Sequence, residues 1–337
     1  MKFDYYVLNS YVPAADGEGP ELYGKWIEQV ILAEELGFEC AWFTEHHFGR
    51  FGGMLPSPPM LMAALAQRTQ RIRLGTAVVL LPLHHPLHVA EETAMLDILS
   101  NGRIEVGVGR GMASQPYQLF GTDPAIAQEK LEEQVEMLLA AWTEVPFRWE
   151  GKYYQCPSPI TLRPTPLQRP HPPLWMPAGR EPDHARWIGR HGINFMTLPW
   201  LMGFDVARQV IAQYRAGLRE ADYTEDAREV LTYFPTYVGE TPERARQESE
   251  ECWSRFRQVS DEERGGPAPN AVPYDVLIAE SRLIIGDPAM CRQHVKRICE
   301  EVGIDRLALL FHFGGMPQDR VLASMRRFAS EVAPGFA

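Results

Sequence analysis

The chain alternates short apolar runs with longer segments whose apolar residues recur at helical spacing, and it does so along almost its whole length. The apolar runs predict eight strands, at residues 3–8, 39–43, 72–81, 104–109, 174–177, 193–197, 229–238 and 306–313. The segments around them predict helices at residues 21–36, 57–69, 86–99, 125–142, 183–191, 205–220, 241–255, 288–302 and 317–331. Strands that alternate with helices pair in parallel through right-handed crossovers, and eight of them close most simply into a (β/α)8 TIM barrel. We therefore predict an α/β fold with a single barrel domain over residues 1–337.

A doubly wound open sheet is the alternative to a barrel. Such a sheet would carry a dinucleotide-binding fingerprint near the start of the chain. The glycine cluster from Gly107 to Gly111 instead follows the fourth predicted strand, and Met112 occupies the place of the third fingerprint glycine. The sequence therefore argues against a Rossmann site.

Two stretches interrupt the alternation. Residues 146–173 are rich in proline and aromatic residues without a clear period, and we interpret them as an excursion over the surface. Residues 256–283 combine proline, glycine and charged residues, which is the composition of a mobile insertion. The sequence thus predicts a mobile loop after the seventh strand.

Charge and cysteine content restrict the class of ligand. The formal net charge of −11 argues against nucleic acid and an anionic membrane, because both require a basic surface. The five cysteines are scattered without Cys-x-x-Cys spacing, which indicates neither a disulfide framework nor a zinc site. No apolar run is long enough to span a bilayer, and no signal-like region precedes Pro13. These features predict a cytoplasmic protein that acts on a small molecule.

Ionisable residues follow two of the predicted strands. In a TIM barrel the carboxyl ends of all strands face one bowl, where ligands bind. Glu45 and His46 follow the second strand, and His46 is the predicted centre of the site. Arg110 follows the fourth strand and suits a phosphate group, because a guanidinium offers planar bidentate donors. A structural ion pair with a carboxylate such as Asp97 or Glu105 is the alternative interpretation of this arginine.

The fifth predicted strand adds a second candidate for anion binding. It is followed by Ala178, Gly179 and Arg180, whose backbone N–H groups at the start of a helix also favour phosphate. The histidines at 84, 85 and 88 have no carboxylate at a metal-ligand spacing, so no metal site is predicted. The sequence contains neither a Gly-x-Ser-x-Gly elbow nor a P-loop. Redox chemistry on a bound, phosphorylated cofactor is the chemistry that remains.

Several short motifs occur in one order along the chain. They are Met1-Lys2-Phe3, Glu45-His46-His47-Phe48, Gly75 to Pro82 with His85-Pro86, Gly102 to Gly107, Arg110-Gly111, Phe120-Gly121-Thr122-Asp123, Gly303-Ile304-Asp305 and Ala323-Ser324-Met325. Together they resemble the bacterial luciferase family of flavin-dependent monooxygenases over almost the whole chain, and they are especially similar to the luciferase α subunit.

The resemblance implies a two-component enzyme in which a separate flavin reductase supplies reduced flavin mononucleotide (FMNH2). In such an enzyme the flavin reacts with O2 to a C4a-hydroperoxide, which oxygenates an organic substrate. The resemblance also implies a homodimer, and it equates residues 256–283 with the family's mobile active-site loop. It places His46 on the catalytic histidine, Arg110 on the phosphate-binding arginine, and Ala77-Val78 on a non-prolyl cis peptide against the flavin ring. The predicted cofactor contacts are Glu45, Ala77, Val78, Arg110, Met112, Ala178, Gly179, Arg180 and Trp200.

Two positions depart from the family pattern. Gly109 replaces the reactive cysteine that luciferase α has beside the flavin, and Arg180-Glu181 replaces a serine that many relatives place on the phosphate. The resemblance therefore implies a luciferase-like monooxygenase and not light emission.

Apolar side chains near the strand ends predict a pocket for a small, neutral, hydrophobic substrate. They are Phe48, Phe51, Met54, Leu55, Leu83, Leu201 and Met202. Two alternatives share the barrel. One is a deazaflavin (F420)-dependent oxidoreductase that transfers hydride, whose anionic tail would use Arg110, Arg180 and Arg50. The other is a non-catalytic flavin-binding subunit.

Overall fold

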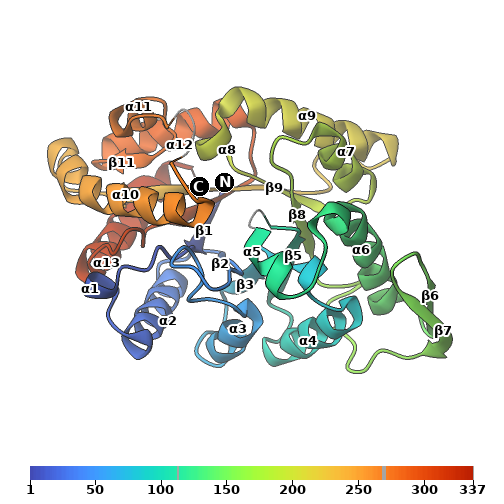
Figure 1. The fold of residues 1–337 in the computed structure, drawn as a ribbon. Coiled ribbons are helices and arrows are strands. Elements are labelled where there is room, and N and C mark those ends of the chain that lie inside the picture. The colour runs from blue at the N-terminus through green and yellow to red at the C-terminus, as the bar shows by residue number, and fades with distance from the viewer. Residues whose placement is uncertain (112–113, 268–270, 337) are drawn as a thin grey trace.

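The computed structural model describes residues 1–111, 114–267 and 271–336, and eight parallel strands within them close into a barrel (Figure 1). Around the barrel the strands follow in the order β1 (Lys2–Val7), β2 (Cys40–Phe43), β3 (Arg73–Thr76), β5 (Ile104–Gly109), β8 (Leu174–Pro177), β9 (Asn194–Thr197), β10 (Val230–Val238) and β12 (Arg306–Leu310). Pairing of β12 with β1 closes the ring. The predicted (β/α)8 barrel is confirmed, and each of the eight predicted strands is present.

Helices surround the barrel and bury its outer face. Those that the sequence predicts are α2 (Gly19–Glu35), α3 (Pro58–Ala66), α4 (Pro86–Leu99), α6 (Ala127–Thr143), α7 (Pro182–Arg190), α9 (Phe204–Glu220), α10 (Pro242–Arg264), α12 (Pro288–Val302) and α13 (Gln318–Arg327). Short helices that it does not predict are α1 (Pro13–Asp16), α5 (Ser114–Leu119), α8 (Pro199–Met202) and α11 (Tyr274–Ala279). Single 3-10 or π turns lie at Leu81–Leu83 (η1), Pro124–Ile126 (η2), Phe328–Val332 (η3) and Ala333–Phe336 (η4). In the described part of the chain no helix is both long and apolar enough to cross a membrane. All five cysteines are free.

Helix α10 begins as predicted and ends nine residues later than predicted. Thr241 caps its start by accepting a hydrogen bond from the backbone N–H of Arg244, and Pro242 occupies the first position. The helix continues to Arg264 and ends at Gly265, whose left-handed φ of 76° favours glycine. The expected mobile insertion at 256–283 is therefore wrong for its first nine residues, because buried apolar residues keep the helical period past 255.

The rest of that insertion also contains regular structure. Helix α11 is followed by a short additional strand, β11 (Ile284–Gly286), which pairs in parallel with the carboxyl end of β10. Residues 268–270 lie outside the described residues. Mobility of this segment, which the resemblance implies, stays a prediction.

The other expected excursion, 146–173, contains an antiparallel hairpin of β6 (Phe147–Glu150) and β7 (Gln155–Ile160). The hairpin projects beside α6 at the lower right of Figure 1. Phe147 is fully buried and anchors it, whereas β7 is mostly exposed. The segment lies on the surface as predicted, but it is more regular than its proline content suggests.

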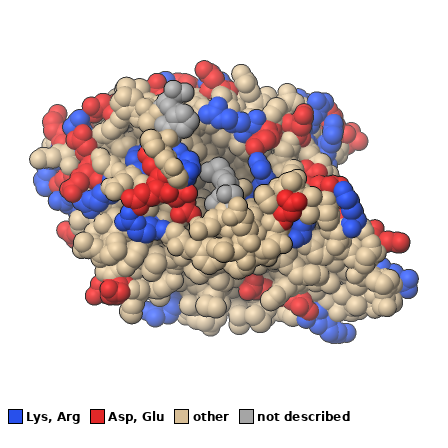
Figure 2. Space-filling model, in the orientation of Figure 1, with Lys and Arg blue, Asp and Glu red and all other residues tan. Residues whose placement is uncertain are grey.

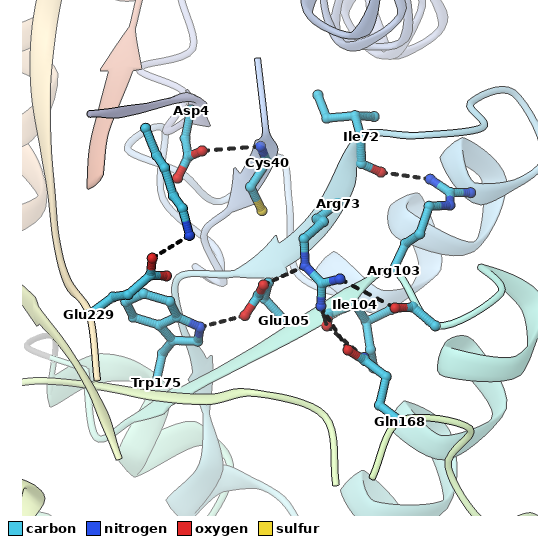
Figure 3. A network of polar contacts seen from close by, with 12 residues as sticks. Asp4, Cys40, Ile72, Arg73, Arg103, Ile104, Glu105, Gln168, Trp175 and Glu229 are labelled. Atoms are coloured by element: carbon cyan, nitrogen blue, oxygen red, sulfur yellow. Dashed lines mark hydrogen bonds and ion pairs between the residues drawn. The ribbon is translucent and has the colours of Figure 1, made fainter. Parts of the chain in front are cut away.

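Polar side chains fill the amino-terminal end of the barrel, and Figure 3 shows part of this network. Buried Asp4 accepts hydrogen bonds from Arg306 Nε at 2.8 Å and Nη2 at 2.9 Å. Glu105 accepts a hydrogen bond from Trp175 Nε1 at 2.7 Å and forms an ion pair with Arg73. Burial alone would lower the pKa of Arg306, but the Asp4 carboxylate raises it above its ordinary value. Charges at the amino-terminal end are thus paired with one another. We therefore expect ligand-binding groups at the carboxyl-terminal end of the barrel.

Candidate active site

The carboxyl ends of the strands open into a bowl on the face shown in Figure 2, which is hollowed at its centre. Glu45 and His46 follow β2, Arg110 follows β5, and Gly179 follows β8. The barrel therefore gathers at one end residues that are far apart in sequence. Met112 lies outside the described residues, so its predicted cofactor contact stays a prediction.

The third predicted strand, 72–81, is divided by a non-prolyl cis peptide bond between Ala77 and Val78. This confirms the bond that the resemblance implies. The chain resumes its pairing as β4 (Val79–Leu80), which lies beside β5. The Tyr6 hydroxyl donates a hydrogen bond to the carbonyl oxygen of Ala77 at 3.1 Å. The bend is thus held from within the barrel, and its contact with a flavin stays a prediction.

Two glycines of β5 allow neighbouring strands to approach closely. A Cβ atom on Gly107 would lie 2.1 Å from the carbonyl oxygen of Thr76. A Cβ atom on Gly109 would lie 2.8 Å from Val78 Cγ2 and 3.1 Å from Pro177 Cγ. The cysteine of luciferase α could therefore not be placed at Gly109 without displacing Val78 or Pro177.

Glu45 is buried, and its carboxylate is fully engaged by the protein. Oε1 lies 2.8 Å from both His47 Nε2 and His84 Nε2, and Oε2 accepts the backbone N–H of Leu80 at 2.9 Å. Burial alone would raise the pKa of Glu45, but the two histidine hydrogen bonds lower it below its ordinary value. The backbone N–H of Glu45 also donates to the carbonyl of Val78 at 3.4 Å. Glu45 therefore positions the bend after β3, and its predicted contact with the cofactor stays a prediction.

His46 points away from Glu45 and is partly exposed. Its ring lies 5.7 Å from the ring of Phe51 in an edge-on arrangement. Gly52 packs against it so closely that a Cβ atom would lie 2.5 Å from the imidazole. Burial lowers the pKa of His46 to about 4, and the nearby Glu45 charge only partly offsets this. No described residue hydrogen-bonds either ring nitrogen, so the neutral imidazole is available to a ligand.

Arg110 and Gly179 converge on one carboxylate. Arg110 Nη2 lies 2.9 Å from Glu181 Oε1, and the backbone N–H of Gly179 donates to Glu181 Oε2 at 3.0 Å. Asp97 instead accepts hydrogen bonds from residues 167 and 168, while Glu105 belongs to the base of the barrel. Arg110 therefore does pair with a carboxylate, as the alternative interpretation expects, but its partner is Glu181 and not Asp97 or Glu105. Its predicted contact with a phosphate stays a prediction.

Two other predicted members of this site behave differently. The N–H of Ala178 donates to the carbonyl of Met196 at 3.2 Å, so it serves sheet pairing and not a ligand. This corrects its predicted role. Arg180 is exposed and has no ion pair with a described residue. The predicted contact of Arg180 with the cofactor stays a prediction.

The residues predicted for the apolar pocket differ in burial. Leu55, Trp200 and Met202 are buried, whereas Met54, Leu83 and Leu201 are partly buried. The Phe51 ring, after β2, and the Trp200 ring, after β9, lie 5.4 Å and 6.3 Å from the ring of Phe256 on α10. These three rings form an apolar wall, and its contact with a substrate stays a prediction.

Phe48 does not belong to this wall. Its side chain is 59% exposed and lies against the rings of His47 and Phe120, at 5.7 Å and 5.6 Å. The backbone turns at Phe48, whose φ of 66° is left-handed, so its side chain follows a different course from that of Phe51. The predicted pocket role of Phe48 stays a prediction.

The aromatic residues of α10 were missed from the sequence. Trp253 and Phe256 are buried, and their rings lie 6.0 Å and 6.3 Å from that of Trp200. The signal that could have found them is the helical spacing of Cys252, Phe256 and Val259, which continues past the expected end of the helix. Trp253 and Phe256 thus extend the apolar wall onto α10.

The bowl also contains a buried donor without a partner. Asn9 Nδ2 is buried and has no hydrogen-bond partner among the described residues. A buried donor of this kind is rarely left unpaired, so it indicates a ligand with acceptor atoms. With the anion site at Arg110 and Gly179, this donor fits a phosphorylated, acceptor-rich cofactor such as a flavin nucleotide. Within the described ranges no cluster of three or more His, Cys, Asp or Glu residues is arranged to hold a metal ion.

Comparison with known proteins gives one consistent result. A family model described as luciferase-like monooxygenase matches residues 1–306. The chain is 30% identical to the oxygenase component of a flavin-dependent trigonelline monooxygenase from Acinetobacter baylyi, over 94% of this chain and 91% of that protein. It is 24% identical to an alkanal monooxygenase alpha chain from Photorhabdus luminescens, over 99% and 96%. The crystal structure of monooxygenase RslO1 from Streptomyces bottropensis matches with a TM-score of 0.94 at 28% identity and covers 100% of both chains.

Proposed function

The chain belongs to the luciferase-like monooxygenase family, and from this premise we propose that it is the FMNH2-dependent oxygenase of a two-component system. A separate reductase supplies the reduced flavin, one oxygen atom of O2 enters the substrate, and the other leaves as water. The observation that carries the proposal is the shared location of His46, the Ala77–Val78 bend and the Arg110–Gly179 anion site at one end of the barrel. When bound, reduced flavin supplies the two electrons that activate O2.

The anion site is the proposed holder of the flavin phosphate. A guanidinium and a backbone amide are both charge-complementary to phosphate, and their hydrogen bonds to it are charge-assisted. The Val78 side chain lies against Gly109, and the backbone at this bend is fixed by Tyr6 and Glu45. This arrangement favours Val78 as a rigid surface against which the flavin ring packs.

His46 is the proposed acid/base residue. Its lowered pKa keeps the imidazole neutral at pH 7, so it can accept a proton on one ring nitrogen and donate from the other. Because neither ring nitrogen is hydrogen-bonded by a described residue, His46 can exchange a proton with the substrate or the flavin.

The apolar wall supports a small, neutral, hydrophobic substrate such as an aldehyde, a ketone or a terpenoid. Phe51, Trp200 and Phe256 offer ring surfaces and no charge.

The F420 alternative has less support. Its anionic tail would need basic residues at the mouth in addition to Arg110, and Arg50, one of the candidates, is paired with Glu262. Basic and acidic side chains are accordingly mixed around the hollow in Figure 2. A non-catalytic role is disfavoured by the accessible imidazole of His46.

We also propose a homodimer in the cytoplasm. Neighbouring helices α3 and α4, at the lower edge of Figure 1, expose an apolar stripe that a second copy would cover. Its members are Met60, Met95, Ile98 and Leu99. The free cysteines suit a reducing compartment.

Mixing the photoreduced FMN complex with O2 tests the proposed function. We expect a long-lived flavin absorbance that differs from those of oxidised and reduced flavin, and label from 18O2 in the product of a hydrophobic substrate. Immediate reoxidation at the rate of free flavin would contradict the proposal. Hydride transfer to or from F420 under anaerobic conditions would establish the alternative.

A further inference from the structure

The carboxylate of Glu181 occupies the place that the proposed function gives to the flavin phosphate. One oxygen lies 2.9 Å from Arg110 Nη2 and the other accepts the Gly179 N–H at 3.0 Å. We propose that Glu181 is an internal competitor for the phosphate, so that FMN binds only when this side chain swings away. The inference rests on the proposed function, and it assigns to Glu181 a role in setting flavin affinity.

The side chain is placed so that it can leave. Arg110 and Glu181 are each about half exposed, with 48% and 49% of the side-chain surface accessible. An ion pair as exposed as this one is weak, because water screens it and two flexible side chains must be ordered to form it. A phosphate carries a larger charge and more acceptor oxygens than a carboxylate, so it can outcompete Glu181 for the same donors.

The backbone position supports the same conclusion. Glu181 is the residue just before the nine-residue helix α7, yet its side chain makes no capping hydrogen bond to that helix. It turns back to Gly179 instead, and a Cβ atom on that glycine would lie 3.2 Å from Glu181 Oε2. Release of the carboxylate therefore exposes both donors without breaking any bond within α7.

A competing conformation lowers the apparent affinity by the fraction of molecules in which the site is free. For a weak surface ion pair this factor is about three to ten. Such a reduced affinity suits a two-component oxygenase. That enzyme must take up reduced FMN from solution and release oxidised FMN into solution in every cycle. Glu181 thus favours exchange of the cofactor over its permanent retention.

Glu181→Gln tests the proposal, because it removes the charge and keeps the shape. Titration of the full-length variant with oxidised FMN, followed by flavin fluorescence, should give a dissociation constant about three to ten times lower than that of the parent. Riboflavin, which lacks the phosphate, should bind unchanged. Inorganic phosphate should compete with FMN at lower concentration in the variant than in the parent.

Asp183→Asn is the matched control. Asp183 lies in the first turn of α7, is exposed, and carries the same charge without contacting Arg110. It should leave FMN affinity unchanged. Equal gains in both variants would mean a general charge effect and would overturn the proposal. Unchanged or weaker FMN binding in Glu181→Gln would also overturn it, the latter by showing that Glu181 orients Arg110 for the phosphate.

Arg110→Ala separates this proposal from the proposed function. If Arg110 holds the phosphate, its loss should weaken FMN about 10- to 100-fold and leave riboflavin unchanged. It should also reduce the effect of Glu181→Gln, because the carboxylate then competes for the Gly179 N–H alone. Equal losses for FMN and riboflavin would refute the phosphate site itself. A phosphate-specific loss in Arg110→Ala, with no gain in Glu181→Gln, would refute only the competition.

Discussion

Neighbouring residues at the end of β2 have different roles because their side chains point in opposite directions. His46 faces the bowl, whereas Glu45 and His47 face the segment around Leu80 and His84. The sequence identifies the location of this motif, because ionisable residues directly follow a buried strand. It does not reveal which of the three meets the ligand, since that depends on the direction in which the strand enters its loop. The sequence for this reason does not reveal that Glu45, predicted as a cofactor contact, also holds the bend after β3.

His46→Ala should retain FMN but lower the rate of substrate oxygenation by roughly 10²–10⁴-fold, the usual effect of removing a positioned acid/base. The phosphate site and the bend at Ala77 do not depend on this imidazole. Flavin titration and product formation, measured on the same preparation, check both parts. Undiminished product formation would remove His46 from the mechanism.

The lowered pKa of His46 predicts the acid limb of the rate profile. An imidazole that accepts a proton must be neutral, and its neutral form dominates above a pKa of about 4. The rate should therefore persist from pH 7 to pH 5 and fall as the pH approaches 4. The measurement is kcat/KM against pH, with circular dichroism at each pH to confirm that the chain is folded. A limb centred near 6.5 would contradict burial as the controlling effect.

The elements follow the sequence closely where packing is local and less closely where it is distant. The strands were predictable because each is a short, mainly apolar run of residues that favour strands and is largely buried on both faces. The end of α10 was not, because charged residues 261–264 resemble a loop while Phe256 and Val259 remain buried beneath them. The hairpin at 147–160 is an exception, because its pairing is local but Pro157 and Pro159 within β7 hide the strand pattern.

Phe256→Ala tests whether α10 forms part of the substrate site. Phe256 is buried among Phe51, Trp200 and Phe313, so its loss should lower the free energy of unfolding by about 3–5 kcal/mol. It should also raise KM for hydrophobic substrates. Denaturant titration and steady-state kinetics measure the two effects.

Phe147→Ala is the matched control for Phe256→Ala. Phe147 is equally buried, but it lies in the β6–β7 hairpin outside the bowl. It should cost similar stability and leave KM unchanged. An equal rise in KM in both variants would mean that loosened packing, and not contact with the substrate, is responsible.

At the scale of the whole molecule, the two ends of the barrel are chemically opposed. The base pairs Arg306 with Asp4 and Arg73 with Glu105 in buried surroundings. The bowl instead holds an imidazole whose pKa is lowered by burial, an unpaired donor at Asn9, and the half-exposed ion pair of Arg110 and Glu181. Stability is thus concentrated at one end, and the other end is left with groups that bind and react.

The exposed stripe on α3 and α4 predicts the assembly of this molecule. Met60 and Met95 are 75% and 52% exposed, which is costly for large apolar side chains unless another surface covers them. Met95→Glu should therefore convert a homodimer to a monomer, because the substitution buries an unpaired charge at the centre of the contact. Light scattering coupled to size-exclusion chromatography measures the mass. Gln209→Glu adds the same charge to the exposed face of α9 and should leave the dimer intact. A parent protein that is monomeric, or a Met95→Glu variant that remains dimeric, would show that this stripe is not the interface.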